Sequence, residues 1–455
     1  MAAIAIFIIG AETLLLYCFP LIIRLAIKYS KFNLMAFFIS LKNTFLLLLF
    51  LISSCGNKNA ATTAENNDGK EDNKTTEAIV TGANRTEVYL PLLKGKNVGV
   101  VANQTSVIYK KDRKEGEKLT AGEHYTHLVD SLLSLGVNLK KVFSPEHGFR
   151  GKADAGEKVK DGVDTKTGLP ITSLYGKNRK PTAEQLEGLD LVIFDIQDVG
   201  VRFYTYISTL HLLMEACAEN NIPVMVMDRP NPNGHYIDGP SMEPEHTSFL
   251  GMHTIPLVHG MTIGEYAGMI NGEKWLENGI QCELEVIPME NYDHSRPYSV
   301  PIKPSPNLPT DKAINLYPSL GLFEGTTINA GRGTDYQFQI YGAPFLDKTH
   351  NIYTYTPQSN EGAKYPKHKD VQCFGTDLRK EEDLSKLSLK WIISAYANTP
   401  EGEKFFNTDS FTKHAGTEKL QKQIEEGLSE EEIRKSWRAD LKKFKKVRAK
   451  YLIYN

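Results

Sequence analysis

Residues 191–200 read LVIFDIQDVG, and this stretch decides the fold. Leu191 to Phe194 form a short, wholly apolar run, which is typical of a strand buried on both faces of a sheet. Asp195 and Asp198 follow where the run ends. Three further runs of this kind have polar residues after them: Asn97 to Val101 (NVGVV), Lys141 to Phe143 and Pro223 to Met227 (PVMVM).

Segments with helical spacing separate these runs: Tyr125 to Leu135, Ala183 to Leu189 and Thr209 to Asn220. Apolar strands that alternate with helices predict an α/β protein with a Rossmann-like parallel sheet. Ligands of such sheets bind outside the carboxyl ends of the strands. The polar residues at these ends are Asn103, Glu146, Asp195, Asp198, Asp228, Arg229 and Asn231.

Each of these polar residues has a simpler interpretation, because Asp and Asn after a strand often cap the next helix. For Asp228 and Asn231 the two interpretations are equally consistent with the sequence. Glu146 and Asp198 differ, since glycines rather than clear helix starts follow them. We therefore expect the carboxyls of these two residues to belong to a site.

The composition narrows the class of protein. The 455 residues are 41% hydrophobic and 24% charged, which excludes a wholly disordered, collagen-like or polytopic membrane protein. A formal net charge of -2 gives no reason to expect nucleic acid as a partner. The five cysteines are too scattered for a disulfide scaffold or a CxxC zinc site, and cofactor motifs such as GxGxxG and HExxH are missing. We expect neither a metal nor a cofactor.

The beginning of the chain has the pattern of an export signal. Phe45 to Ile52 (FLLLLFLI) suit the apolar region of a secretory signal, and Ile52-Ser53-Ser54-Cys55 resembles a bacterial lipobox. We expect a signal and upstream segment over 1–54, with the lipoprotein signal at 35–54 and lipid attachment at Cys55. The alternative is a membrane helix from Ala2 to Ile27, which Glu12, Pro20 and Arg24 interrupt.

The rest of the chain divides into a tether and two domains. Residues 55–87 are polar, and we expect them to form a flexible tether because they offer little apolar surface to bury. We expect a Rossmann-like domain over 88–240 and a second α/β domain over 241–455, in which Thr262 and Glu265 have the spacing of a helix capping box. The spacing of the apolar residues between Ser429 and Ile453 predicts a long helix. The residues after Cys55 lack an acidic cluster, so we expect a periplasm-facing protein of the cell envelope, anchored to the membrane by lipid.

The most specific signal is a set of long sequence blocks: SPEHGFRG (144–151), GLPITSLYG (168–176), FDIQDVGVRFYTYIS (194–208), DRPNPNG (228–234), PLVHGMTIGE (256–265), PSPNLPT (304–310), YPSLGLFEGTTINAGRG (317–333) and YGAPF (341–345). These blocks resemble the exo-β-N-acetylmuramidase family. The resemblance implies a glycosidase that releases N-acetylmuramic acid from the non-reducing ends of peptidoglycan fragments. It also implies a Rossmann-like domain, a second α/β domain and a site in the cleft between them.

Cleavage of a glycosidic bond usually needs two carboxyl groups. Glu146 is the best candidate for the acid, because it follows a strand and Pro145 and stands beside His147, a further candidate for the substrate site. The alternative role of Glu146 is a structural hydrogen bond to the glycine turn after it. For the second carboxyl the candidates are Asp195, Asp198, Glu324 and Asp335.

N-acetylmuramic acid carries a lactyl carboxylate, for which a guanidinium is the best partner. Arg150, Arg202, Arg229 and Arg332 lie in the family-like blocks. We expect these arginines, first of all Arg202 and Arg229, to contact the substrate, together with Tyr204 in the aromatic stretch after Arg202. One or two of the four arginines are expected to brace loops instead. Amide contacts to the sugar are expected from Asn103, Asn231 and Asn307.

Three functions are consistent with these features. The first is a lipid-anchored exo-muramidase that acts on N-acetylmuramic acid linked to N-acetylglucosamine. The second is a non-catalytic lipoprotein that binds cell-wall sugars, and the third is a hydrolase of another substrate or one assisted by a metal. Turnover of a muramide distinguishes the first from the second.

Overall fold

The computed structural model describes residues 77–110, 119–150 and 161–455, and its main feature is a seven-stranded sheet. The strand order is β11-β8-β7-β1-β4-β6-β5, and every neighbouring pair is parallel except β5 and β6. The strands are β1 (Val98–Ala102), β4 (Leu139–Ser144), β5 (Gly162–Val163), β6 (Pro170–Ser173), β7 (Leu191–Asp195), β8 (Val224–Met227) and β11 (Leu284–Ile287). The predicted parallel sheet and its four predicted strands are confirmed.

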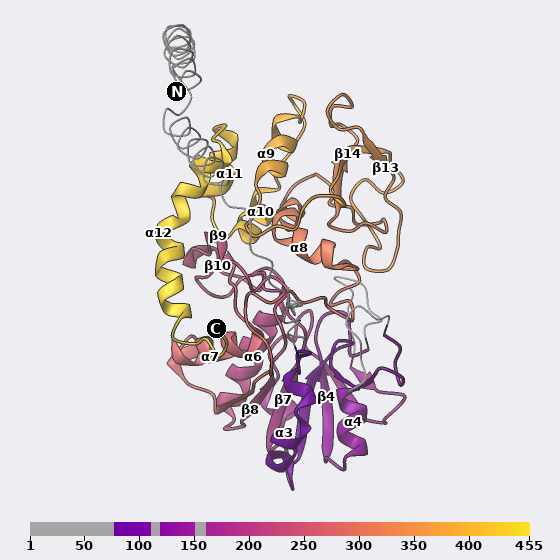
Figure 1. The fold of residues 1–455 in the computed structure, drawn as a ribbon, viewed down its shortest axis with the longest axis vertical. Helices are drawn as coiled ribbons and strands as arrows, with labels where there is room; N and C mark the ends of the chain where they lie inside the picture. The colour runs from indigo at the N-terminus through magenta and orange to yellow at the C-terminus, as the bar shows by residue number, and fades with distance from the viewer. Residues whose placement is uncertain (1–76, 111–118, 151–160) are drawn as a thin grey trace, which may run out of the picture. The chain divides into compact units, whose positions relative to one another are not determined.

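Helices cover both faces of this sheet, because the strand residues alternate between two apolar cores. In β7, Leu191 and Ile193 pack in one core, while Val192 and Phe194 pack in the other. Leu128 of α4 belongs to the first core. The helices are α3 (Thr86–Leu93) and α4 (Leu128–Ser134) on the first face, with α5 (Ala183–Leu186), α6 (Tyr206–Glu219) and α7 (Ile263–Gly272) on the second (Figure 1).

The expected domain boundary at residue 240 falls inside the part of the chain that builds the sheet. β11 pairs with β8, and α7 packs against both strands. The segment that forms the Rossmann-like sheet therefore extends to Ile287. The helix expected from Tyr125 begins at Leu128 instead, because β3 (Tyr125–His127) pairs with β2 (Val107–Tyr109).

The later part of the chain forms a smaller sheet and five helices, which lie above the large sheet in Figure 1. The smaller sheet has the order β12-β14-β13 and is antiparallel. The elements are β9 (Asp238–Ser241), β10 (Pro256–Val258), α8 (Asp311–Leu320), β12 (Ile340–Ala343), β13 (Tyr353–Tyr355), β14 (Cys373–Asp377), α9 (Lys390–Ala397), α10 (Thr408–Ala415), α11 (Lys419–Glu425) and α12 (Glu430–Arg448). Short 3₁₀ turns are η1 (Gly82–Asn84), η2 (Pro244–His246), η3 (Glu277–Gly279) and η4 (Gly321–Gly325).

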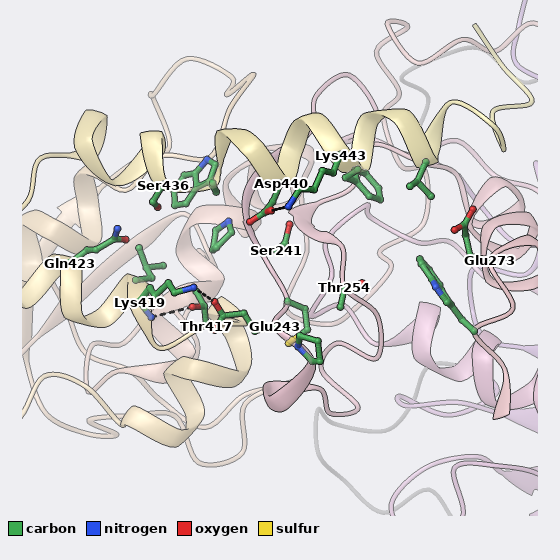
Figure 2. A pocket seen from close by; sticks show the side chains of 18 residues that line it. Ser241, Glu243, Thr254, Glu273, Thr417, Lys419, Gln423, Ser436, Asp440 and Lys443 are labelled. Carbon is green, nitrogen blue, oxygen red and sulfur yellow. Dashed lines mark hydrogen bonds and ion pairs between the residues drawn. The ribbon is translucent and has the colours of Figure 1, made fainter. Parts of the chain in front are cut away.

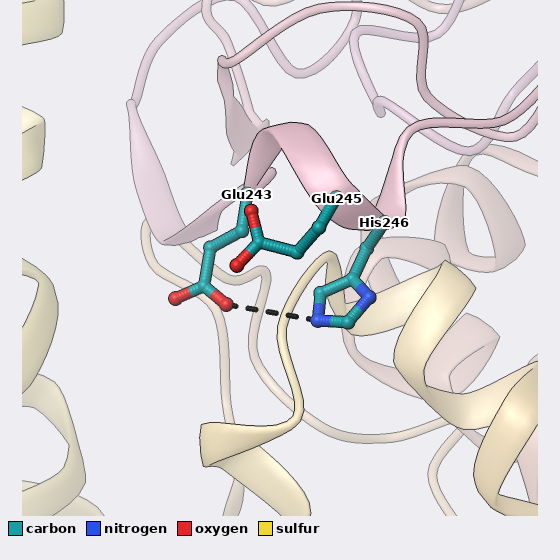
Figure 3. Close-up of side chains that lie close together, drawn as sticks. All are labelled: Glu243, Glu245 and His246. Carbon is teal, nitrogen blue, oxygen red and sulfur yellow. Dashed lines mark ion pairs between the residues drawn. The ribbon is translucent and has the colours of Figure 1, made fainter.

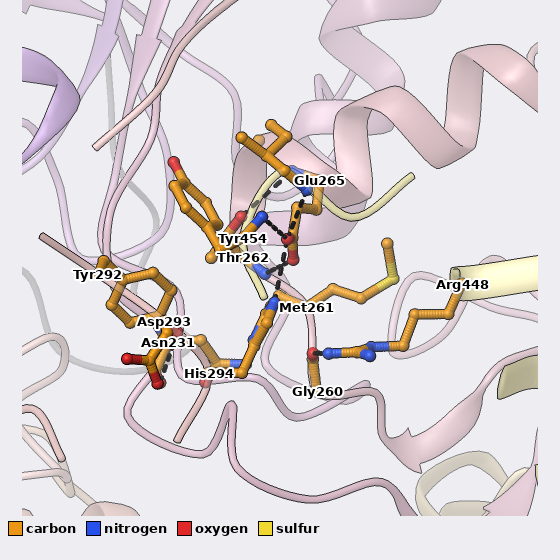
Figure 4. A network of polar contacts seen from close by, with 12 residues as sticks. Asn231, Gly260, Met261, Thr262, Glu265, Tyr292, Asp293, His294, Arg448 and Tyr454 are labelled. Atoms are coloured by element: carbon orange, nitrogen blue, oxygen red, sulfur yellow. Dashed lines mark hydrogen bonds and ion pairs between the residues drawn. The ribbon is translucent and has the colours of Figure 1, made fainter. Parts of the chain in front are cut away.

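The C-terminal tail is fastened to the start of α7 (Figure 4). Thr262 and Glu265 form the predicted capping box, and Glu265 Oε1 also accepts the backbone N–H of Ile453 at 3.0 Å. The Tyr454 hydroxyl donates to Asp228 Oδ2 at 2.7 Å. The C-terminal residues therefore contact the segment directly after β8. Among the described helices, none is both long and apolar enough to cross a bilayer.

Candidate functional site

Glu146 lies in a sharp turn directly after β4. His147 and Gly148 have φ angles of 70° and 81°, and the left-handed turn holds the partly exposed Glu146 side chain at the carboxyl edge of the sheet. The buried His147 ring lies 3.2 Å from the Ser305 hydroxyl. His147 therefore links this turn to the proline-rich loop before α8, which is a positioning role.

Two side-chain hydroxyls contact the two carboxyl oxygens of Glu146. The Tyr175 hydroxyl is 3.0 Å from Oε1, and the Thr205 hydroxyl is 3.4 Å from Oε2. Tyr175 follows β6, and Thr205 is the residue before α6. Because hydroxyls can both donate and accept, this pair accommodates Glu146 either as an acid or as a carboxylate.

A second carboxyl and a guanidinium, those of Glu324 and Arg332, form an ion pair within electrostatic range of Glu146. Arg332 Nη1 donates to Glu324 Oε2 at 2.7 Å, and both side chains are about one quarter exposed, at 26% and 23%. The negative charges of Glu324 and then Glu146 raise the pKa of Arg332. Burial is the main cause of the raised pKa of Tyr317, and the negative charges of Glu324 and Glu146 raise this pKa further. The Glu324–Arg332 pair from the later part of the chain therefore lies within electrostatic range of Glu146 at the sheet edge.

The charge state of Glu324 follows from its cationic neighbours. Burial acts to raise the pKa of its carboxyl, but the charges of Arg332 and Lys367 outweigh this effect and hold the pKa below the ordinary value. Glu324 is therefore ionised at neutral pH. Asp335, another candidate for the second carboxyl, is exposed on the loop after Arg332.

Asp198 is a buried carboxyl behind the tyrosines of this cluster. Its Oδ2 accepts the Gly200 N–H at 2.7 Å, while its Oδ1 has no hydrogen-bond partner within the described ranges. Burial raises the pKa of Asp198 to about 7. Its charge acts on Tyr206 and Tyr317, which also lie in the field of Glu146.

The raised pKa of Asp198 predicts a pH-dependent stability. In the folded protein Asp198 keeps its proton up to about pH 7, whereas an unfolded Asp releases it near pH ~4. The folded state then binds more protons, so this contribution to stability falls as the pH rises between these values. Asp198→Asn should make the urea midpoint less sensitive to pH between about pH 4 and about pH 7. If the urea midpoint of Asp198→Asn depended on pH as strongly as that of the unaltered protein, the raised pKa of Asp198 would be contradicted.

Asp195 and Arg229 form a buried ion pair. Arg229 Nε and Nη2 donate to the two Asp195 oxygens at 2.6 and 2.8 Å, and Nη2 also donates to the Val107 carbonyl. Asp195 is 0% and Arg229 2% exposed. This arrangement contradicts the expectation that Asp195 acts as a catalytic carboxyl and that Arg229 contacts the substrate, because each group satisfies the other beneath the surface.

Arg202 is also structural, which corrects the other arginine expectation. Its guanidinium is fully buried and donates to four backbone carbonyls, those of Pro240, Ile255, His414 and Ala415, at 2.7–3.0 Å. The residue thereby joins β9 and β10 to the end of α10. Arg150 is held by Asp164 at 2.7 Å and by Asp130 at 3.0 Å, which accords with bracing. Of the four expected arginines, Arg332 is the one on whose pKa the charge of Glu146 acts.

The three asparagines and Tyr204 hold loops rather than face outward. All four are buried. Asn103 donates to the Tyr206 hydroxyl at 3.0 Å, Asn231 to the Met261 carbonyl at 2.9 Å, Asn307 to the Gly362 carbonyl at 2.8 Å and Tyr204 to the Pro304 carbonyl at 2.7 Å. These contacts favour a structural role for the four residues over the expected direct binding of sugar groups. Asp228 accepts the Gly264 N–H at 2.8 Å and so caps α7.

Sequence reasoning missed Tyr175, Thr205 and Tyr317 as site residues. All three lie in the family-like blocks, and this position was the one sequence signal that could have indicated them as site residues. Tyr175 reaches Glu146 because β6 lies beside β4 in the sheet, and the sequence pattern did not indicate β6 as a strand.

A pocket of about 470 Å³ lies elsewhere, between α12 and the segment after β9 (Figure 2). Its charged side chains have partners of opposite charge: Lys419 with Glu243 at 2.6 Å, Lys443 with Asp440 at 3.2 Å and Glu273 with Lys450 at 2.9 Å. Catalysis by a free carboxyl is therefore not expected there, and the residues that line it include none of the expected site residues.

Glu243, Glu245 and His246 place potential metal-ligand atoms within 4.8 Å of one another (Figure 3). Lys419 already neutralises Glu243. A second group, Glu215, Glu219 and Glu277, is bound by Lys180 through Glu215 and Glu219. We assign no metal to either group.

Comparisons with known proteins match nearly the whole described chain. The family model for the N-terminal part of exo-beta-N-acetylmuramidase NamZ matches residues 98–312, and that for its C-terminal part matches 315–454. A peptidoglycan beta-N-acetylmuramidase NamZ of Bacillus subtilis is 40% identical over 385 residues, which are 80% of this chain and 89% of that protein.

Two crystal structures of DUF1343 family proteins from Bacteroides fragilis are also similar. The first has a TM-score of 0.74 and 42% identity, and the second has 0.69 and 29%. Each match covers 83% of this chain and 99% of the other. Both structures therefore have the same fold as this chain.

Proposed function

Since the chain belongs to the exo-β-N-acetylmuramidase NamZ family, we propose that it hydrolyses the bond of N-acetylmuramic acid at the non-reducing ends of peptidoglycan fragments. The observation that carries this proposal is the cluster at the carboxyl edge of the sheet. There the partly exposed Glu146 contacts Tyr175 and Thr205, and the Glu324–Arg332 ion pair lies within electrostatic range of it. Turnover of a chromogenic N-acetylmuramide by the purified protein tests it.

In the proposed reaction, Glu146 delivers a proton to the glycosidic oxygen as the bond to the anomeric carbon breaks. Tyr175 and Thr205 orient the Glu146 carboxyl through its two oxygens. Glu324 supports the positive charge that develops on the sugar, because Arg332 and Lys367 keep it ionised. Water then adds at the anomeric carbon and gives up a proton to one of these two carboxylates, which yields free N-acetylmuramic acid. Asp198 is buried and less suited to the second role.

Arg332 is the proposed partner of the lactyl carboxylate. It is partly exposed, and among the described residues its guanidinium donates only to Glu324 and the Gly362 carbonyl. Arg332→Met should therefore lower the preference for N-acetylmuramide over N-acetylglucosaminide by roughly 30- to 1000-fold, since a bidentate pair contributes on the order of 2–4 kcal/mol. The ratio of the two kcat/KM values measures this. Arg202→Met would instead be expected to unfold the protein. A folded Arg332→Met variant that keeps the full preference for N-acetylmuramide would contradict the placement of Arg332 at the lactyl carboxylate.

Lipid anchoring at Cys55 is a second part of the proposal. Cys55 and the signal at 35–54 lie outside the described residues, so the support is the lipobox-like sequence alone. Cys55→Ser should move the protein from the membrane fraction to the soluble fraction, because the acylated side chain is lost. An unchanged membrane fraction would favour the upstream helix over Ala2 to Ile27. The proposed location is the periplasm-facing side of the cell envelope.

A further inference from the structure

The pocket between α12 and the segment after β9 is elongated (Figure 2). Gln423 and Glu273 lie at opposite ends of it, and Ser241 and Thr254 lie between them. The described residues that line it are distinct from the Glu146 cluster, which consists of Glu146, Tyr175, Thr205, Glu324 and Arg332. An elongated pocket of about 470 Å³ suits a segment of a chain molecule rather than a compact ligand.

Trp275 offers a fixed aromatic surface to this pocket. Its ring stacks on the His253 ring, with the ring centres 4.4 Å apart and the planes at 20°. The buried His253 is itself held by hydrogen bonds to the Tyr266 hydroxyl at 2.8 Å and to His211 at 2.9 Å. Trp275 is partly exposed, so the ring surface that His253 does not cover is available to a ligand. Because its support is rigid, little conformational freedom is lost when a ligand packs on this ring.

The charged side chains of the pocket favour an uncharged ligand. Each of them has a partner of opposite charge, at distances between 2.6 and 3.2 Å. A charged ligand would have to break one of these ion pairs, whereas an uncharged polar ligand can add hydrogen bonds to paired groups.

Uncharged polar side chains complete the lining. Ser241 and Thr254 contribute hydroxyls, and Gln423 contributes an amide. Within the described part of the chain, none of these three side chains makes a hydrogen bond. Hydroxyls and amides both donate and accept, and so they match the hydroxyls of a sugar. The partly positive C–H groups of a sugar ring also pack well on the negative face of an aromatic ring.

We propose that this pocket is a second sugar-binding site, which holds an uncharged stretch of a glycan chain with one sugar ring against Trp275. The ligand class follows from the aromatic surface, the paired ions and the available hydroxyls that meet in one elongated pocket. The inference goes beyond the proposed function, because it needs no catalysis at Glu146. Such a site keeps the protein bound to a glycan polymer while single sugars are removed elsewhere on the molecule.

Isothermal titration calorimetry of the full chain with chitohexaose, an uncharged chain of N-acetylglucosamine units, tests this site. Thr254→Trp should weaken binding by about tenfold or more, because a large side chain at this exposed position fills the pocket. Trp275→Ala should weaken it similarly through loss of the stacking surface. Tyr365→Ala is the matched control: this aromatic side chain is 82% exposed and lies outside the pocket lining, so binding should be unchanged. Thr254→Trp should also hydrolyse a small chromogenic muramide as fast as the unaltered protein.

The inference is overturned if the unaltered protein does not bind chitohexaose, or if a folded Thr254→Trp variant binds it with full affinity. An equal loss of binding with Tyr365→Ala would overturn it as well. If chitohexaose slows muramide hydrolysis equally in the unaltered protein and in Thr254→Trp, it binds at the Glu146 cluster, and the second site is contradicted. If no muramide is hydrolysed but chitohexaose binding still depends on Thr254 and Trp275, the proposed function fails and the second site stands.

Discussion

Glu146→Gln should slow the hydrolysis of an N-acetylmuramide by about a thousandfold, within the range that general acid catalysis contributes. Gln has the same shape and can still contact the hydroxyls of Tyr175 and Thr205, but it cannot deliver a proton. The effect should therefore be in kcat, with little change in KM. Circular dichroism and the urea midpoint should match those of the unaltered protein.

Glu187→Gln is the matched control for this substitution. Glu187 is exposed at the end of α5, and the change of charge is the same. Its kcat should be unchanged. Activity of Glu146→Gln within tenfold of the unaltered protein would mean that Glu146 has only the structural role.

Asp195→Asn should destabilise the protein by about 3–5 kcal/mol, because it leaves the buried Arg229 charge without its partner. The measurement is the free energy of unfolding in urea. The double variant Asp195→Asn with Arg229→Met removes both charges and should be more stable than Asp195→Asn alone. A folded, fully stable Asp195→Asn variant without activity would contradict the structural role and return Asp195 to the catalytic candidates.

The sheet could be predicted because its strands are encoded locally. Leu191 to Phe194 are apolar at every position, since both faces of a central parallel strand are covered. The strands at and near the two edges of the sheet escaped prediction for the opposite reason. β5 and β6 contain Gly162 and Pro170 and are partly or fully exposed, and β11 alternates, with Glu285 exposed. Because β11 was missed, the expected boundary of the sheet domain was placed too early.

The roles of the arginines could not be predicted, because their partners are distant in sequence. Arg229 meets Asp195 34 positions away, and Arg202 meets the Ala415 carbonyl 213 positions away. In sequence, Arg202 beside an aromatic stretch is indistinguishable from a sugar-binding arginine. Glu146 was found because its position depends on β4 alone, which the local pattern already indicates. The Glu324–Arg332 pair spans only eight residues, yet its approach to Glu146 depends on how the two parts of the chain pack.

The central claim is that the Glu146 cluster removes N-acetylmuramic acid from non-reducing ends. The most direct measurement is mass spectrometry of the products from two disaccharides, one with N-acetylmuramic acid and the other with N-acetylglucosamine at its non-reducing end. We predict that the first is split into N-acetylmuramic acid and N-acetylglucosamine by the unaltered protein and not by Glu146→Gln, while the second stays intact. Cleavage of the second disaccharide at an equal rate, or cleavage of neither, would contradict the account.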